Sequence, residues 1–212
     1  MTSIRAPAER PDHTGSVSAD RHTSVVYGRD LPGDDELRLC GDVSDGKRAL
    51  ELGVSTQYNA VAFALAGAKS LAVDPDSGRI AKLREKASEA DVRVECHIAE
   101  LADLEFATSG SVEIVLANGT LEAVEDLGRL LRQVHRVLKP SRSFVIRLRH
   151  PFADVFQGEV AAPYGSSTRT VEDWFTALGR ANFRVDVMHE LGVTERSPVP
   201  TTLLVRARKE GS

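Results

Sequence analysis

Short apolar runs alternate with longer amphipathic stretches through the middle of the chain. The apolar runs predict strands at about 48–52, 70–74, 92–96, 112–117 and 143–149. The amphipathic stretches predict helices at about 57–67, 77–90 and 123–138. Such alternation is typical of a parallel sheet with right-handed crossovers and helices on both faces. We therefore expect an α/β fold.

The helix predicted at 123–138 has the clearest signal, because its apolar residues recur at spacings of three and four. They are Val124, Leu127, Leu130, Leu131, Val134, Val137 and Leu138. Lys139-Pro140 is predicted to end this helix, because proline cannot continue the backbone hydrogen-bond ladder.

The pattern changes after Phe152, where Gly158, Pro163 and Gly165 predict a loop over the edge of the sheet. Thr170 and Asp173 then have the spacing of a capping box, with Asp in the usual Glu or Gln position. The helix that they begin is expected to bury its apolar residues, Val171, Trp174, Phe175 and Leu178. Two more strands are predicted, at Phe183–Val187 and Thr202–Ala207.

The N-terminal segment differs from the rest of the chain. Residues 1–24 are rich in Pro, Ser, Thr, Asp and Arg without apolar periodicity, and predict a disordered tail. Order is expected from Val25, followed by a short helix from Asp34 to Cys40. With 212 residues, of which 42% are hydrophobic, the chain can bury one core, and residues 25–212 are expected to form a single domain.

Charge and cysteine usage narrow the function classes. A net charge of −4 argues against a nucleic-acid partner, which needs a basic face. No apolar run approaches the ~20 residues of a membrane span, and the N-terminus lacks the layout of a secretory signal. We expect a cytoplasmic protein with no membrane partner. Cys40 and Cys96 are expected to be buried, reduced thiols, and no metal site is expected because neither lies in a ligand-like cluster.

Polar residues follow the predicted strands in order. They are Glu51 and Gly53, then Asp74 and Pro75, then Glu100 and Leu101, then Asn118. Ligands of open α/β sheets bind beyond the carboxyl ends of the strands, so these positions are expected to face one crevice. The alternative is that each is an ordinary polar residue of a strand-end loop.

Residues 48–74 have the order of a nucleotide-binding half: a strand, a tight turn at Gly53, an apolar helix and a second strand that ends on an acid. Asp74 is suited to accept hydrogen bonds from both hydroxyls of a ribose, because a charged acceptor makes short, strong bonds. An alternative role for Asp74 is to stabilise the N-terminus of the helix at 77–90, and both roles are compatible.

Several segments resemble class I S-adenosylmethionine-dependent methyltransferases, over about residues 27–209. Glu51-Leu-Gly53-Val-Ser55-Thr-Gln57 resembles the acid-x-Gly-x-Gly-x-Gly motif of that family, with Ser55 and Gln57 in place of two glycines. Ser111-Val-Glu-Ile-Val115 is similar to its Ser-Phe-Asp-Leu-Val strand, and Arg136-Val-Leu-Lys-Pro140 to its Arg-Val-Leu-Lys-Pro-Gly-Gly segment. Further segments are similar to a bacterial small-molecule subgroup: His150-Pro-Phe152, Arg169-Thr170, Ala181-Asn-Phe183, and Asn59-Ala60 after the turn.

The resemblance implies a Rossmann-like seven-stranded fold, mostly parallel, with an antiparallel C-terminal strand and S-adenosylmethionine as cofactor. It implies that the acid after the third strand accepts from the adenine amino group, and Glu100 is preferred over Asp103 for this role. Glu51 would orient the turn and, through water, the methionine ammonium. The implied cofactor-binding residues are Glu51, Gly53, Ser55, Asn59, Asp74, Pro75, Glu100, Leu101 and Asn118.

Methyl transfer needs alignment and a dry site more than it needs particular catalytic groups. His150, at the tip of the fifth strand, is the candidate general base, because the unperturbed pKa of histidine lies near neutrality. A packed or solvated turn residue is the alternative. Tyr27, Arg149 and Tyr164 are candidates for the substrate pocket, and Arg147 and Arg149 together would suit an acidic substrate. In the alternative, Arg149 pairs with a carboxylate such as Asp154.

Two functions remain in competition. The first is methyl transfer from S-adenosylmethionine to a small molecule by in-line displacement, in a monomer or homodimer. The second is a catalytically inactive methyltransferase-like protein with a binding or assembly role. Ser55 adds a side chain beside the cofactor, and Gln57 is expected where the helix start packs against the strand, so both residues favour the second. A nicotinamide dinucleotide oxidoreductase is poorly supported, because its Gly-x-Gly-x-x-Gly turn is absent.

Overall fold

The computed structural model describes residues 24–155, 163–166, 168–195 and 197–211. Seven strands form one sheet in the order β3-β2-β1-β4-β5-β7-β6. Their bounds are β1 Arg48–Leu52, β2 Lys69–Asp74, β3 Val94–Ile98, β4 Val112–Asn118, β5 Leu138–Arg149, β6 Phe183–Leu191 and β7 Thr202–Lys209. The first five strands pair in parallel, whereas β7 runs antiparallel to both β5 and β6. The predicted seven-stranded, mostly parallel fold is confirmed.

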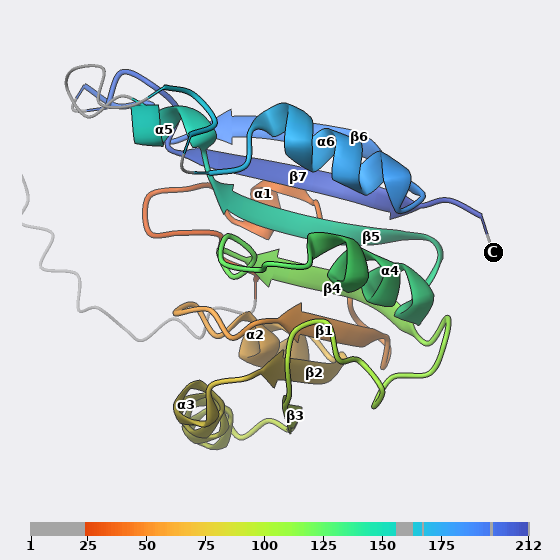
Figure 1. Ribbon diagram of the computed structural model, residues 1–212. Coiled ribbons are helices and arrows are strands. Elements are labelled where there is room, and N and C mark those ends of the chain that lie inside the picture. The colour runs from red at the N-terminus through yellow and green to blue at the C-terminus, as the bar shows by residue number, and fades with distance from the viewer. Residues whose placement is uncertain (1–23, 156–162, 167, 196, 212) are drawn as a thin grey trace, which may run out of the picture.

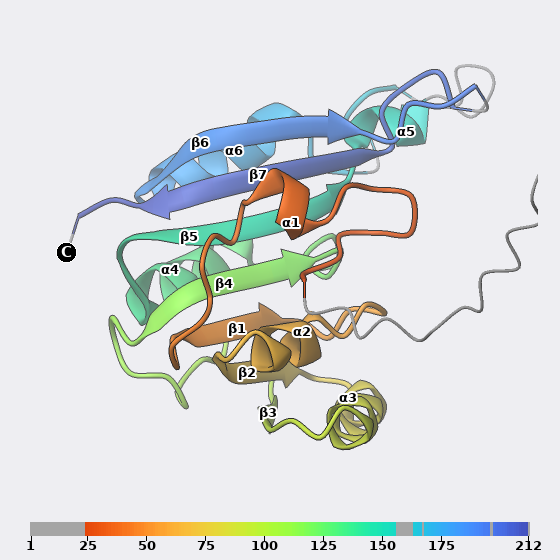
Figure 2. The same cartoon turned by 180° about the vertical axis from the view of Figure 1, so that it is seen from behind.

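Helices cover both faces of this sheet (Figures 1 and 2). Their bounds are α1 Asp34–Leu37, α2 Asn59–Leu65, α3 Ser77–Glu89, α4 Leu127–Val137, α5 Pro151–Val155 and α6 Val171–Arg180. Figure 1 shows α4 and α6 in front of the sheet, and Figure 2 shows α1 and α2 on the opposite face. None of these helices has the length and apolar character needed to cross a membrane.

Two large core clusters lie on the two faces of the sheet, and a third, smaller one joins α3 to β2 through Ile80, Leu83 and Ala72. The larger one joins strand residues such as Leu50 and Phe144 to the apolar stripes of α4 and α6. The second joins Phe63 of α2 and alternate strand residues to the segment around Tyr27. Because alternate residues of a strand point to opposite faces, both clusters draw on the same strands. The central strands are therefore buried on both sides, as parallel strands usually are.

Helix boundaries differ from prediction where capping decides them. The predicted helix at 123–138 begins only at Leu127, because Asp126 accepts the backbone N–H of Arg129 at 2.8 Å. It ends at Val137, before the Lys139-Pro140 pair that was expected to end it, because Leu138 is already extended. That extended backbone lets β5 begin at Leu138, five residues before the predicted start. The predicted capping box of Thr170 and Asp173 is confirmed.

The remaining differences are local. The third strand begins at Val94, two residues later than predicted. Val92 still belongs to the turn that ends α3, because its backbone N–H donates to the carbonyl of Ala87. A short helix, α5, occupies part of the segment predicted as a loop. Phe175 was expected to be buried, but it is 60% exposed on the outer side of α6. Cys40 is buried as predicted, whereas Cys96 is only half-buried.

Two predictions fall on residues that the structure does not describe. The disordered tail was predicted over residues 1–24, and only Ser24 of these is described. Gly158, part of the predicted loop, also lies outside the described residues.

Candidate functional site

The turn after β1 is built around Gly53, which has a φ of +78°. Thr120, from the segment after β4, lies directly over this glycine and donates a hydrogen bond to the carbonyl of Leu52 at 2.6 Å. A Cβ atom on residue 53 would lie 2.5 Å from the Cβ of Thr120. Both the left-handed backbone and the lack of space therefore require glycine here.

Glu51 is fully buried and holds the turn in place. One carboxylate oxygen accepts the backbone N–H and the hydroxyl of Ser55, at 3.1 and 2.7 Å. The other accepts the backbone N–H of Ala60, at the start of α2, at 2.8 Å. Burial raises the pKa of Glu51 above its ordinary value, although these hydrogen bonds oppose the shift. The predicted role in orienting the turn agrees with these bonds.

Ser55 and Gln57, which replace motif glycines, fit the turn without the strain that a left-handed backbone would impose, since neither has a positive φ. The Ser55 side chain is turned inward to Glu51 and is almost fully buried. Gln57 is exposed, so the expectation that it packs between helix and strand is wrong. Tyr58 takes the left-handed conformation instead, at the N-cap of α2.

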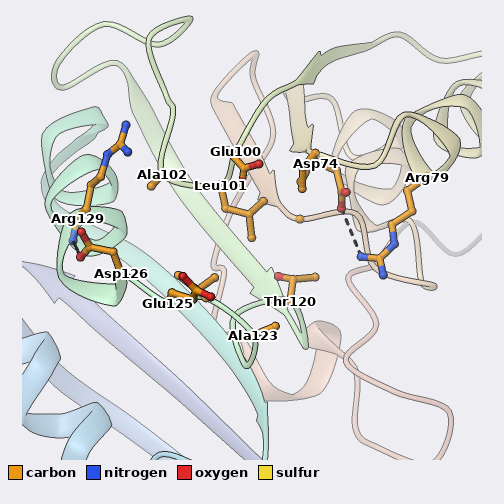
Figure 3. Close-up of a pocket in the computed structure, with 13 residues that line it drawn as sticks. Asp74, Arg79, Glu100, Leu101, Ala102, Thr120, Ala123, Glu125, Asp126 and Arg129 are labelled. Atoms are coloured by element: carbon orange, nitrogen blue, oxygen red, sulfur yellow. Dashed lines mark hydrogen bonds and ion pairs between the residues drawn. The ribbon is translucent and has the colours of Figure 1, made fainter.

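Asp74, at the end of β2, is 2% exposed and reaches back to the turn. Its Oδ2 atom accepts the backbone N–H of Val54 and its Oδ1 atom that of Asp76, both at 2.8 Å. The guanidinium of Arg79, in the first turn of α3, lies 3.6 Å from Oδ2 (Figure 3). Asp74 therefore stabilises the N-terminus of α3, which is one of the two roles predicted for it. Each carboxylate oxygen can accept more than one hydrogen bond, so Asp74 keeps acceptor sites for a ligand.

A cavity of about 550 Å³ opens beside Gly53 and Asp74. Its other predicted lining residues come from two later strand ends, with Pro75 after β2 and Glu100 and Leu101 after β3. The segment 123–126, between β4 and α4, lies across from them (Figure 3). Five predicted residues from three strand ends thus meet at one cavity.

Glu100 and Asp103 were the competing acids after β3. Glu100 is exposed and lines the cavity. Asp103 instead lies 3.5 Å from the guanidinium of Arg129 on α4, and its backbone N–H donates to the carbonyl of Glu100. This arrangement agrees with the preference for Glu100.

A second pocket, of about 320 Å³, lies on the other side of Thr120. Ser55 and Asn118 line it, and the two cavities share Arg79 and Thr120 as a common wall. The side-chain amide nitrogen of Asn118 donates to the carbonyl of Val26 at 3.1 Å. Its Oδ1 atom is buried and has no partner among the described residues, so it is available to a donor from a bound molecule.

Asn59 does not serve the role predicted for it. Its Oδ1 atom accepts the backbone N–H of Val26 at 2.9 Å, and its Nδ2 atom donates to the Val26 carbonyl at 3.0 Å. The side chain is 1% exposed and lines neither cavity. Asn59 therefore fastens the N-terminal segment to α2, and its assignment to the cofactor is corrected.

His150 is also a structural residue. Its Nδ1 atom accepts the backbone N–H of Phe152 at 3.1 Å, which leaves the proton on Nε2, 2.9 Å from a carboxylate oxygen of Glu190. The ring is 3% exposed and lines neither cavity. The structure therefore does not bring His150 to either cavity, and its role as general base stays a prediction without support from this geometry.

The aromatic pocket candidates lie elsewhere. Tyr27 is buried in the second core cluster, and its hydroxyl donates to Asp34 at 2.6 Å. Burial, with the charges of Cys40 and Asp34, raises the pKa of Tyr27 far above its ordinary value. Tyr164 is on the surface, where its hydroxyl accepts the backbone N–H of Val171 at 3.1 Å. Neither tyrosine lines the two cavities.

The two arginines of β5 separate in the structure. Arg149 is exposed and lines neither cavity, and its backbone N–H donates to Glu122. Arg147, two residues earlier on the same face of the sheet, lines the smaller pocket. The side chain of Asp154, the carboxylate suggested as a partner for Arg149, lies outside the described residues.

Several lining residues were not predicted as site candidates, among them Arg79, Lys82 and Thr120. The position of Arg79 could have been predicted from the sequence, because it lies in the first turn of a helix that follows a strand ending on an acid. The position of Thr120 could not, since its contact with Gly53 joins residues far apart in the chain.

The comparisons with known proteins agree with the observed fold. Residues 50–146 match the family model described as a methyltransferase domain. No curated protein matches the chain. A putative S-adenosylmethionine-dependent methyltransferase from Listeria monocytogenes has a TM-score of 0.70 at 18% identity, covering 82% of this chain and 95% of that one. A second such enzyme, from Mesorhizobium loti, has a TM-score of 0.68 at 23% identity with the same coverages.

A third similar structure is geranyl diphosphate C-methyltransferase from Streptomyces coelicolor A3(2), in complex with Mg²⁺, geranyl diphosphate and S-adenosyl-L-homocysteine. Its TM-score is 0.67 at 12% identity, covering 84% of this chain and 79% of that one. These likenesses show the shared fold, and the family match spans its strands from β1 to β5. Residues 50–146 of this chain therefore match a methyltransferase domain, and the chain as a whole shares the fold of S-adenosylmethionine-dependent methyltransferases.

Proposed function

We propose that this protein binds S-adenosylmethionine and transfers its methyl group to a small molecule. The observation that carries the proposal is the cavity of about 550 Å³ in which Gly53, Asp74 and Glu100 meet. The two carboxylates would accept hydrogen bonds from the hydroxyl and amino groups of an adenosyl ligand, and the glycine turn leaves room for that ligand beside them. A structurally similar methyltransferase from Burkholderia thailandensis supports the acceptor class, since it binds the small molecule 1,6-didemethyltoxoflavin together with S-adenosylhomocysteine.

The adenosine part of the cofactor fits the larger cavity. Asp74 would accept hydrogen bonds from the ribose hydroxyls, using the carboxylate sites that its bonds to Val54 and Asp76 leave open. Glu100 would accept from the adenine amino group, and Leu101 would pack against the ring. Pro75, exposed beside Asp74, offers a rigid apolar edge to the same ring.

The methionine part fits the path past Gly53 toward the smaller pocket. Asn118 Oδ1, buried without a partner among the described residues, would accept a hydrogen bond from the amino group of the cofactor. Ser55 lies at the same wall with its hydroxyl turned away to Glu51, so it leaves this path open.

When bound, the cofactor supplies a methyl carbon activated by a sulfonium. The residues of this chain would then align the acceptor with that carbon and exclude water. No histidine lines either of the two described cavities, so a proton on the acceptor would leave by another route. An acceptor atom that is already unprotonated near neutral pH needs no base at all.

The second candidate is a methyltransferase-like protein without activity. The ion pair between Arg79 and Asp74 favours it, because Arg79 stands at the wall between the two cavities. The Arg79 side chain is 57% exposed, however, so it can move aside at low cost in free energy.

Thermal unfolding with saturating ligand separates these functions. S-adenosylmethionine and S-adenosylhomocysteine should stabilise the protein by about 2.7 kcal/mol at a hundredfold excess over Kd, and NAD should not. The absence of a shift with S-adenosylhomocysteine would favour the inactive protein. Activity is then measured as S-adenosylhomocysteine released in the presence of candidate acceptors.

A further inference from the structure

The smaller pocket, beside Asn118, is unusual in its charge. Three cationic side chains line it, namely Arg79, Lys82 and Arg147, and its other lining residues are uncharged. We propose that this pocket binds the oxyanion, a carboxylate or phosphate, of the methyl acceptor, with Arg147 as its main contact. The proposal rests on the proposed function, because it names the class of acceptor that the same site would take.

Arg147 is held in place by the fold. It lies at the carboxyl end of β5, in register with Asn118 of β4. Its side chain crosses Gly119, where a Cβ atom would lie 2.7 Å from the Nη1 atom of Arg147. Gly119 has a φ of +70°, so both the turn and the path of the arginine depend on this glycine. The guanidinium is therefore directed by the backbone around it.

The guanidinium of Arg147 makes no hydrogen bond or ion pair with any of the described side chains. Its Nε atom is buried without an acceptor. A buried donor without a partner costs free energy, and a bound oxyanion would recover that cost. Arginine also presents its N–H groups in a planar fork that matches a carboxylate or a phosphate. The unsatisfied donor thus indicates an anionic ligand.

The other two cations differ in how far they are neutralised. Arg79 lies 3.6 Å from Asp74 and 3.8 Å from Asp76, so its charge is largely balanced. Lys82 is exposed on α3 and has no ion-pair partner among the described residues. Lys82 and Arg147 therefore leave the pocket with a positive potential, which attracts anions and raises their local concentration.

The position of the pocket fits an acceptor rather than a remote anion site. Ser55 and Val54 of the turn after β1 line it, and Thr120 separates it from the larger cavity. The sulfonium of a bound cofactor carries a positive charge, which would add to the attraction for an anionic acceptor. An acceptor anchored by its oxyanion at Arg147 would lie next to the transferable methyl group.

The first test is isothermal titration of protein saturated with S-adenosylhomocysteine. The probes are benzoate, phenyl phosphate and the neutral benzamide. We expect both anions to bind and benzamide to bind at least about tenfold more weakly, as the loss of a charged hydrogen bond predicts. The ratio of benzoate to phenyl phosphate affinity distinguishes the two oxyanions. Equal binding of benzoate and benzamide would overturn the proposal.

Arg147→Gln should weaken anion binding about tenfold or more. Arg149→Gln is the matched control, because it removes the same charge from the same strand outside the pocket, and it should bind as wild type. If Arg147→Gln unfolds the protein, the same titration is made with Lys82→Gln, which changes an exposed residue of α3. We expect this variant to bind the anions about threefold more weakly than wild type. Anion binding that is unchanged in each folded pocket variant would contradict the proposal.

A second source of the oxyanion is the cofactor's own carboxylate. Arg147→Gln should therefore be titrated with S-adenosylhomocysteine and with 5′-methylthioadenosine, which lacks the amino-acid group. We expect both affinities to remain within about twofold of wild type. Selective weakening of S-adenosylhomocysteine would assign Arg147 to the cofactor and overturn the acceptor proposal.

Failure of the proposed function gives a different pattern. In that case S-adenosylhomocysteine does not bind wild type at all, and the proposal that Arg147 binds a methyl acceptor is overturned as well. The benzoate and benzamide titrations on ligand-free protein still decide whether the pocket binds an anion through Arg147.

Discussion

Asp74 accepts the backbone N–H of Val54 at 2.8 Å, and this bond joins the end of β2 to the turn after β1. The same carboxylate lines the larger cavity beside Gly53. One buried side chain thus supports the turn and offers acceptor sites to a ligand. Its two roles can be separated by experiment, because only one of them depends on the ligand.

Asp74→Asn should weaken the binding of S-adenosylhomocysteine about tenfold, because a neutral amide is a poorer acceptor for hydroxyls than a carboxylate. Titration calorimetry measures this effect. Asp103→Asn is the control, since Asp103 pairs with Arg129 and does not line the cavity. Equal affinities in wild type and Asp74→Asn would show that Asp74 does not hold the ribose.

Gly53→Ala should lower the free energy of unfolding by about 2–4 kcal/mol, because the new Cβ would overlap Thr120 and the φ of +78° disfavours it. Chemical denaturation measures this loss. The double variant Gly53→Ala/Thr120→Gly removes the overlap but keeps the backbone strain. It should show a smaller combined loss than the two single variants predict by addition. Strict additivity would contradict the contact.

Glu51 predicts a defined pH dependence of stability. Burial raises its pKa in the folded state, so the folded protein binds the proton more tightly than the unfolded chain does. The contribution of Glu51 to stability is therefore complete below the unfolded pKa and declines as the pH rises through the folded pKa. Glu51→Gln cannot titrate at this position and should remove that decline.

Denaturant unfolding from pH 4 upward in wild type and Glu51→Gln measures the difference. The advantage of wild type should shrink as the pH rises, although the variant also loses an acceptor for Ser55 or Ala60, at about 1–3 kcal/mol. A pH-independent difference between the two proteins would contradict the raised pKa.

Asn59→Ala should release the segment around Val26 without weakening the binding of the cofactor. The variant loses both hydrogen bonds to the Val26 backbone, so the amide of Val26 should exchange with solvent faster. Hydrogen exchange measures this effect, and calorimetry should give an S-adenosylhomocysteine affinity close to wild type. A large loss of affinity with unchanged exchange would restore Asn59 to the cofactor site.

His150→Gln should lower the melting temperature, because a buried ring and its bonds to Phe152 and Glu190 are lost. Methyl transfer to any acceptor that is found should stay within about threefold of wild type near neutral pH, since the ring lines neither cavity. A large loss of turnover at an unchanged melting temperature would return His150 to the active site.

The sequence by itself determined the fold and the order of the polar strand ends. The periodicity of apolar residues, which reflects which face of each element is buried, predicted the strands to within a few residues at most boundaries. Because parallel strands end at one edge of the sheet, the sequence also brought Gly53, Asp74 and Glu100 to one crevice.

Only the tertiary structure decided what each polar side chain contacts. Asn59 and His150 are residue types that often occur in functional sites. In the structure the polar atoms of Asn59 bond to the backbone of Val26, and those of His150 bond to Phe152 and Glu190. Arg147 and Arg149 look alike in the sequence, yet only Arg147 lines a pocket. Hydrogen bonds between segments far apart in the chain leave no periodic signal, so a local pattern predicts which face a residue occupies but not which partner it meets.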